Sequence, residues 1–200
     1  LGGIAQYEYS LIDSLGNEVD GSQTIVTTNL ESLTKIINNV TLSNGQKYYP
    51  RVRAKNNANI WTEFQLSDGV TADGTVPVMT TAVTLNNNVA YSSANNTLKY
   101  KFNPSDVESG ISHFKVEITT GNTGAINAWN NSNGSYTDYD EAVVDYDYDF
   151  DIDNLPPDGT TVYLRVVLKN YAGLESINYY SNAVNIDTSA PIVTSVSDDV

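Results

Sequence analysis

Residues 45–78 read GQKYYPRVRAKNNANIWTEFQLSDGVTADGTVPV, and residues 159–192 read GTTVYLRVVLKNYAGLESINYYSNAVNIDTSAPI. The two stretches align without a gap at an offset of 114 residues, with Gly, Tyr, Arg-Val, Lys-Asn, Ala, Ser, Val, Asp and Pro in step. A second alignment places GGIAQYEYSL at residue 2 on SGISHFKVEI at residue 109, an offset of 107 residues. Self-similarity at a fixed spacing indicates an array of like modules. We therefore expect two copies of one folding unit.

The repeat also predicts where the modules begin and end. We expect an incomplete module over residues 1–76, a complete module over residues 77–190 and the first strand of a following module over residues 191–200. Compared with the second copy, the first copy lacks the residues that would form its first two strands. Two explanations stay open: the stretch is cut from a longer tandem chain, or a neighbouring subunit donates strands to an open sheet edge.

The composition limits the classes of protein to which the chain can belong. There are 24 acidic and 10 basic residues, and the net charge of -14 repels nucleic acid and anionic membrane surfaces. We therefore expect no nucleic-acid partner. The sequence has no cysteine, which excludes disulfides and thiolate metal sites, and no apolar run long enough to span a membrane. Richness in Asn, Ser, Thr, Gly and Tyr indicates an extracellular or cell-surface location.

Alternation of apolar and polar residues predicts an all-β fold. Alternation with period two puts one face of a strand on a core and the other face in water. Turn signals such as Asn44-Gly45 and Asp158-Gly159 separate the alternating runs. Short strands joined by polar turns predict a sandwich of antiparallel sheets. The inward-facing residues of the clearest runs are Tyr7, Tyr9 and Leu11; Leu98, Tyr100 and Phe102; Phe114, Val116 and Ile118; and Val162, Leu164, Val166 and Leu168.

One stretch of the first copy fits two periodicities. Leu33, Ile36, Ile37 and Val40 have the spacing of an amphipathic helix. The counterpart in the second copy, residues 144–152, alternates strictly. Because the repeat should impose one backbone conformation on both copies, we expect residues 31–42 to be mainly a strand.

The string LSNGQKYYPRVRAKNNANIW, residues 42–61, resembles the penultimate strand region of fibronectin type III-like modules. In that family a Tyr hydroxyl bonds back to the backbone near a Leu, and Tyr48 and Leu42 match this corner. The second copy departs from the pattern, because Val162 stands where the Tyr is expected. The strings DVESGISHF and DTSAP are similar to repeats of bacterial and archaeal cell-surface proteins. The resemblance implies tandem antiparallel β-sandwiches, fibronectin type III-like or immunoglobulin-like, with the first module lacking its first strands.

The resemblance implies a mechanical function. Modules of this kind serve as spacers, adhesin stalks and accessory domains of secreted enzymes. We expect a non-catalytic stalk or filament building block of an extracellular surface protein. Its partners would be neighbouring modules of the same chain, or identical subunits joined head to tail. The joints at Pro77 and Pro191 are short and restrict the backbone, which predicts a semi-rigid rod.

The alternative is an adhesin or a carbohydrate-binding accessory module of a secreted enzyme, with glycans as partners. Exposed Trp side chains stack on sugars, so the candidate ligand-contacting residues are Trp61 and Trp129. The competing interpretation is that these side chains cap the end of a sandwich. Four sequons give candidate glycosylation sites at Asn39, Asn95, Asn130 and Asn133.

The string DYDYDFDIDN, residues 145–154, alternates aspartate with large apolar side chains. On a strand its carboxylates line one face about 7 Å apart. One interpretation is a solvated face that discourages unwanted strand pairing. The other is a calcium site, because Ca²⁺ binds several carboxylate oxygens, although one straight strand needs further oxygens from elsewhere. We name these residues the aspartate ladder: Asp145, Asp147, Asp149, Asp151 and Asp153.

Catalysis has no support in the sequence. His113 is the single histidine, and the alternation of its strand points it outward. The sequence contains no nucleophile elbow, metal-binding helix motif or phosphate loop. We therefore expect no catalytic residue, and no cofactor other than the calcium ion considered above.

Overall fold

The structure is a computed structural model that describes residues 3–27, 34–94, 96–123, 135–143, 145–149 and 154–197. The chain forms two compact units, one of residues 1–75 with 107–109 and the other of residues 76–106 with 110–200. No helix within the described ranges has the length and apolar character needed to cross a bilayer.

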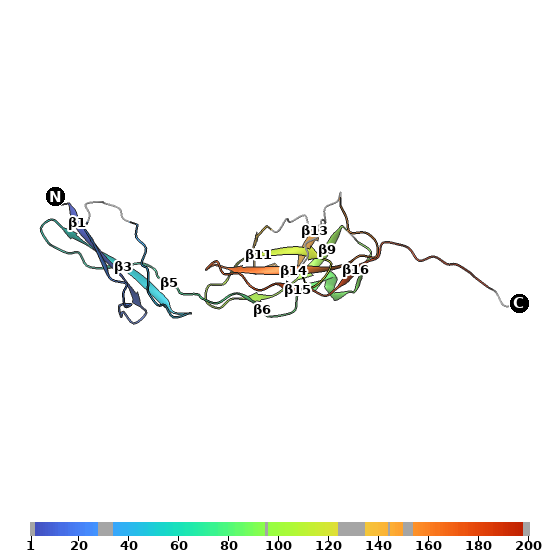
Figure 1. The fold of residues 1–200 in the computed structure, drawn as a ribbon, viewed down its shortest axis with the longest axis horizontal. Coiled ribbons are helices and arrows are strands. Elements are labelled where there is room, and N and C mark those ends of the chain that lie inside the picture. The colour runs from blue at the N-terminus through green and yellow to red at the C-terminus, as the bar shows by residue number, and fades with distance from the viewer. Residues whose placement is uncertain are drawn as a thin grey trace. The chain divides into compact units, whose positions relative to one another are not determined.

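The first unit is built on one antiparallel sheet (Figure 1). The strand order is β2-β1-β3-β4, and β5 also pairs with β3. The long central strands pair from Ile4 opposite Asn56 to Asp13 opposite Tyr48, with a bulge between Ile4 and Gln6. The strands described in this unit are β1 (Ile4–Asp13), β2 (Thr24–Thr27), β3 (Lys47–Asn56), β4 (Gln65–Leu66) and β5 (Val70–Thr71).

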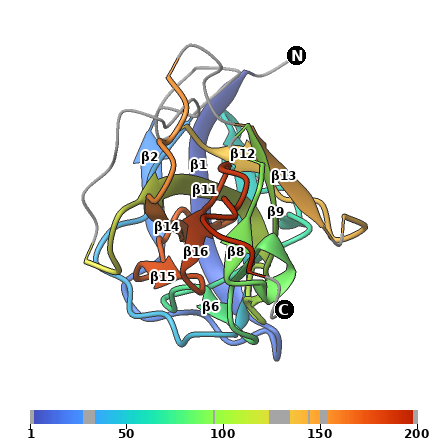
Figure 2. The same cartoon turned by 90° about the vertical axis from the view of Figure 1, so that its right-hand side faces the viewer.

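The second unit is a sandwich of two main sheets. One sheet has the order β12-β11-β14-β16-β8, with β15 also paired to β14, and the other has the order β13-β9-β7. Figure 2 shows β11, β14 and β16 in one layer, and β9 and β13 together in the other. All ladders are antiparallel except that between β16 and β8, and a short ladder joins β10 to β6. The elements described are β6 (Val78–Met79), β7 (Thr84–Leu85), the 3-10 helix η1 (Asn86–Asn88), β8 (Tyr91–Ser92), β9 (Thr97–Lys101), β10 (Pro104–Ser105), β11 (Ile111–Thr119), β12 (Thr137–Asp138), β13 (Tyr146–Asp149), β14 (Thr161–Asn170), β15 (Tyr179–Tyr180) and β16 (Val184–Ile186).

The hydrophobic core of the second unit lies between its two sheets. Alternate side chains of β9, β11 and β14 point into it, so Leu98, Phe114 and Val166 are at most 1% exposed. Phe102 meets Phe114 edge-on at a centroid distance of 5.0 Å, a favourable arrangement for aromatic pairs. The period-two prediction for these strands is confirmed, and so is the all-β fold with antiparallel sheets.

The longest strands of the two units pair in the same way. Tyr7 lies opposite Ala54 in the first unit, and the aligned Phe114 lies opposite the aligned Leu168 in the second. A bulge follows the first residue of both β1 and β11. Isolated bridges join Lys55 to Trp61 and, 114 positions later, Lys169 to Glu175. Aligned residues of the two copies therefore have equivalent neighbours along these strands.

Residues 34–42 differ from the prediction. They form neither a strand nor a helix, so the expected strand is wrong over this stretch, while residues 31–33 lie outside the described residues. The counterpart β13 is a strand because it pairs with β9, from Tyr146 opposite Tyr100 to Asp149 opposite Thr97. Strand backbone needs a hydrogen-bonding partner. Among the described strands of the first unit, none pairs with residues 34–42.

Candidate functional site

The described part of the aspartate ladder lies on the outer face of the smaller sheet in the second unit. Tyr148 is 2% exposed and faces the core, whereas Asp147 and Asp149 face solvent. Both carboxylates contact the neighbouring strand β9: Lys99 Nζ lies 3.0 Å from Asp147, and the Thr97 hydroxyl donates to Asp149 at 2.9 Å. The hydrogen bond to Asp147 raises the pKa of Lys99.

For the other residues of the aspartate ladder, the structure gives no contacts that would define a cation site. Asp145 is exposed, and Asp151 and Asp153 lie outside the described residues. The calcium site stays a prediction.

A second group of polar contacts fixes the chain where it leaves the last strand of each unit. In the second unit, Asp158 Oδ1 accepts from the Thr188 backbone N–H at 2.5 Å, and Asp158 Oδ2 accepts from the Ser189 hydroxyl at 2.9 Å. These two donors, the Thr188 N–H first, lower the pKa of Asp158. In the first unit the aligned Asn44 Oδ1 accepts from the Gly74 N–H, also at 2.5 Å. We call these bonds from Asn44 and Asp158 the exit contacts.

Backbone bonds support both exit contacts. Gly45 N–H donates to Ala72 O at 2.8 Å, and the aligned Gly159 N–H donates to Ile186 O at 2.8 Å. Both glycines have φ above +70°, a conformation that glycine adopts without steric cost. The Asn-Gly and Asp-Gly turns therefore present a side-chain oxygen to the departing chain in both units.

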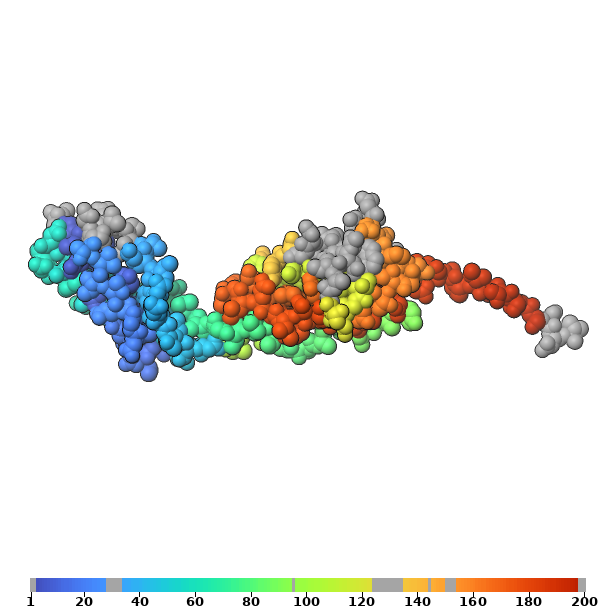
Figure 3. All heavy atoms as spheres, viewed as in Figure 1, coloured from blue at the N-terminus to red at the C-terminus, as the bar shows by residue number. Residues whose placement is uncertain are grey.

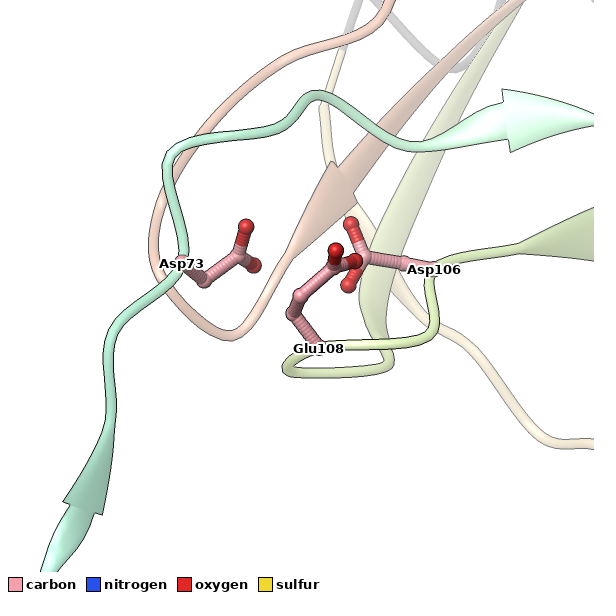
Figure 4. Close-up of side chains that lie close together, drawn as sticks. All are labelled: Asp73, Asp106 and Glu108. Carbon is pink, nitrogen blue, oxygen red and sulfur yellow. The ribbon is translucent and has the colours of Figure 1, made fainter. Parts of the chain in front are cut away.

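Two carboxylates of the first unit, those of Glu108 and Asp73, form hydrogen bonds close to the exit contact of Asn44. Asn44 Nδ2 donates to Glu108 Oε1 at 2.8 Å, and the Ser109 hydroxyl donates to Asp73 Oδ2 at 2.5 Å. Figure 4 shows that Asp73 comes from the segment after β5, and that Asp106 and Glu108 come from the loop after β10. Glu108 thus holds the amide of Asn44 in the orientation that leaves its oxygen for Gly74.

Within the described residues, the first unit also has an apolar face that no strand covers. A groove of about 840 Å³ runs between the sheet and residues 35–42. Val52 is 41% exposed here, whereas the aligned Val166 in the second unit is fully buried. The residues that line the groove include Tyr9, Ile37, Leu42, Pro50, Val52 and Leu66.

The opposite, polar face of β1 is better buried than this apolar face. Glu8 is 4% exposed and Ser10 is 1% exposed, whereas Tyr9 between them is only half-buried. Burial by itself raises the pKa of Glu8, but hydrogen bonds from Arg53 at 2.7 Å and from Gln23 at 2.6 Å outweigh it, so the pKa is lowered. Apolar side chains normally lie inside a domain, so the order of burial on the two faces of β1 is reversed among the described residues of the first unit.

The aromatic and glycosylation predictions have mixed outcomes. Trp61 is half-buried, and its ring lies under the Arg53 guanidinium at 4.8 Å and the Lys55 ammonium at 5.5 Å. Its indole therefore already has partners within its own unit. Asn39 is exposed at a position with φ of 58°. The remaining candidates, Trp129, Asn95, Asn130 and Asn133, lie outside the described residues.

The tyrosine corner is confirmed in the first unit. Ser43 N–H donates to the Tyr48 hydroxyl at 2.9 Å, one residue after Leu42. In the second unit, Val162 takes this position and is fully buried in the core. Sequence reasoning missed the exit contacts and the groove. The signal for the exit contacts was present, because Asn44 and Asp158 occupy aligned positions, but both were assigned only to turns.

No protein-family model and no curated protein sequence matches the chain. Among solved structures, it is similar to fibronectin(III)-like modules of CbhA from Clostridium thermocellum, at 13% identity and a TM-score of 0.41, over 93% of this chain and 80% of that one. For the FN1-FN3 domains of chicken CNTN1, the identity is 15%, the TM-score 0.35 and the coverage 94% and 59%. For a beta-1,2-glucanase from Parabacteroides distasonis, the identity is 14% and the TM-score 0.29, over 96% of this chain and 28% of that one. With β11 and β14 in one sheet packed on β9 and β13 in the other, the fold is fibronectin type III-like.

Proposed function

We propose that this chain is a non-catalytic structural segment of an extracellular surface protein, where it acts as a stalk or a filament building block. The observation that carries the proposal is the pair of exit contacts. Asn44 and Asp158 occupy aligned positions, and each binds the backbone that leaves the last strand of its unit. Two units with the same device at the same place fit a function that depends on the direction in which the chain departs.

The physical effect of an exit contact is to remove a hinge. A departing backbone that is held by a side-chain oxygen at 2.5 Å has fewer rotational states than a free linker. Pro77 and Pro191 follow three residues after the bonded N–H groups of Gly74 and Thr188, and they restrict φ at the next step of the chain. A spacer or a fibre needs this stiffness, whereas a ligand-binding module does not.

Spin labels test the expected stiffness. The chain has no cysteine, so Leu15→Cys and Ile177→Cys, at side chains 84% and 70% exposed, each introduce one label per unit. At concentrations where the protein is monomeric, we expect double electron–electron resonance to give one narrow distribution of distances between the two labels. Asn44→Ala should broaden it, because that substitution removes the bond to Gly74. Asp158→Ala acts on the other exit and serves as the control that leaves the distribution unchanged. A broad distribution in the parent protein would contradict a stalk.

The alternative function, a carbohydrate-binding or adhesin module, makes a different prediction. Trp61 is the described residue that would carry it, and Arg53 and Lys55 already lie over its ring. We expect Trp61→Ala to leave retention on immobilised glycans unchanged. Loss of retention with an unchanged melting temperature would favour the binding module over the stalk.

A further inference from the structure

The exit contact of the first unit contains a pair of residues that can react with each other. Because glycine has no Cβ to hinder the approach, the backbone nitrogen of Gly45 can attack the side chain of Asn44. A bond forms between this nitrogen and Cγ of Asn44, and Nδ2 takes the proton from the Gly45 nitrogen and leaves as ammonia. Water then opens the resulting succinimide ring, which leaves aspartate or isoaspartate at position 44.

The folded first unit holds the groups that take part in this reaction. Asn44 Oδ1 accepts from the Gly74 N–H at 2.5 Å, and Asn44 Nδ2 donates to Glu108 Oε1 at 2.8 Å. The attacking nitrogen is also bonded, because the Gly45 N–H donates to Ala72 O at 2.8 Å. The bond from Gly74 polarises the side-chain carbonyl and alone would favour attack, but it also prevents the rotation that attack needs. The reaction therefore has to wait until these bonds open.

Glu108 favours an amide over a carboxylate at position 44. It belongs to the same unit as Asn44, and its Oε2 accepts from the Thr75 hydroxyl at 3.1 Å. Both oxygens of Glu108 thus act as acceptors. An aspartate at position 44 would place a second negative charge within hydrogen-bond distance of this carboxylate, and like charges repel. Deamidation would therefore replace an attraction by a repulsion.

The second unit has the opposite arrangement at the aligned position. One oxygen of Asp158 accepts from the departing backbone, and the other accepts from the Ser189 hydroxyl at 2.9 Å. In the first unit the aligned Thr75 donates its hydroxyl to Asp73 and Glu108 instead. A carboxylate is therefore stabilised in the second exit contact and destabilised in the first.

We propose that Asn44 is a modification site, which the fold protects from deamidation and whose conversion to aspartate or isoaspartate opens the exit contact of the first unit. The side chain of Asn44 is exposed, and Figure 3 shows residues 38–45, in light blue, at the surface of the first unit, where water reaches them. Local opening of the bonds around Asn44 is the step that starts the change. The inference rests on the proposed function, because the loss of this contact removes stiffness that a stalk needs.

Peptide mapping by mass spectrometry tests the protection. The full chain is incubated at mildly alkaline pH with and without urea, and the deamidated fraction of Asn44 is followed with time. We expect the native protein to react about 100-fold more slowly than the chain in urea, because each bond that must open contributes about fivefold. The other Asn-Gly pair, Asn133-Gly134, should react at the same rate as Asn44 in urea, which checks the assay.

Variants at Glu108 show whether its bond to Asn44 is part of the protection. Glu108→Ala should raise the native rate of deamidation about fivefold and leave the rate in urea unchanged. Glu108→Gln should keep the slow native rate, because its side-chain oxygen still accepts from Asn44. Glu63→Ala removes an exposed carboxylate of the same unit that no described bond joins to Asn44, and it is the matched control. The melting temperature of each variant separates this effect from a general loss of stability.

The spin labels at Leu15→Cys and Ile177→Cys test the consequence of deamidation. Asn44→Asp, which carries one product of the reaction, should broaden the distance distribution of the monomer. Addition of Glu108→Gln to Asn44→Asp should narrow it again, because the new amide donates to the carboxylate. Glu108→Gln alone should leave the distribution narrow.

Two results would overturn the inference. One is deamidation of Asn44 in the native protein at a rate equal to or above the rate in urea. The other is an Asn44→Asp protein whose distance distribution is as narrow as that of the parent. Both can occur in a protein whose parent distribution is narrow, so failure here leaves the stalk function standing.

Discussion

Single residues at aligned positions make equivalent contacts with different chemistry. Arg51 Nε donates to the Ser10 hydroxyl at 2.8 Å, whereas the aligned Arg165 pairs with the buried carboxylate of Glu117. Asn170 Oδ1 accepts the Leu174 N–H at 2.7 Å, and the aligned Asn56 does the same for Ile60 at 3.0 Å. The repeat therefore preserves the geometry that fixes the backbone more closely than it preserves charge.

The exit contacts differ in one property, which is titration. The pKa of Asp158 is lowered from its ordinary value of 3.8. The side-chain amide of Asn44 does not titrate. A carboxyl whose folded pKa is lowered stabilises the fold above its unfolded pKa, and that contribution disappears as the pH falls through the folded value. We expect Asp158→Asn, which keeps an oxygen acceptor for Thr188, to remove this dependence. The melting temperature of the parent should fall more than that of the variant between about pH 5 and about pH 2. Equal falls would contradict the assignment.

At the scale of elements, alternation specified strands only where a neighbouring strand exists. The strands β9, β11 and β14 were predictable from their period-two runs, because each of them has a partner strand. The tyrosine corner was predictable from the spacing of Tyr48 and Leu42. The conformation of residues 34–42 was not predictable in this way, because a strand is stabilised by hydrogen bonds to a neighbouring strand and not by its own sequence pattern. The exit contacts were also beyond local rules, since Asn44 and Gly74 meet only after the sheet between them has formed.

The paired strands β9 and β13 give a test of the calcium interpretation. Asp147 and Asp149 already contact Lys99 and Thr97, so their mutual repulsion is relieved without an ion. We expect removal of calcium by EDTA to leave the melting temperature unchanged. Asp147→Asn should lower it only slightly, because exposed ion pairs contribute little. A fall with EDTA in the parent that disappears in Asp147→Asn would support a calcium site on the ladder.

At the scale of the whole molecule, two units of one pattern differ in how completely their cores are closed. The apolar cluster of the second unit draws on both of its sheets. Among the described residues of the first unit, the buried apolar side chains are Leu11, Ile12 and Tyr48. Since apolar burial dominates folding, the first unit should be the less stable of the two. Separate cores also make separate cooperative transitions.

Calorimetry should therefore show two transitions, with the first unit melting at the lower temperature. Val166→Ala should destabilise the second unit by about 2 kcal/mol and lower the upper transition, because Val166 is fully buried. Val52→Ala, at the aligned position with 41% exposure, should barely move the lower transition. A single transition, or equal shifts from both substitutions, would contradict an open first unit.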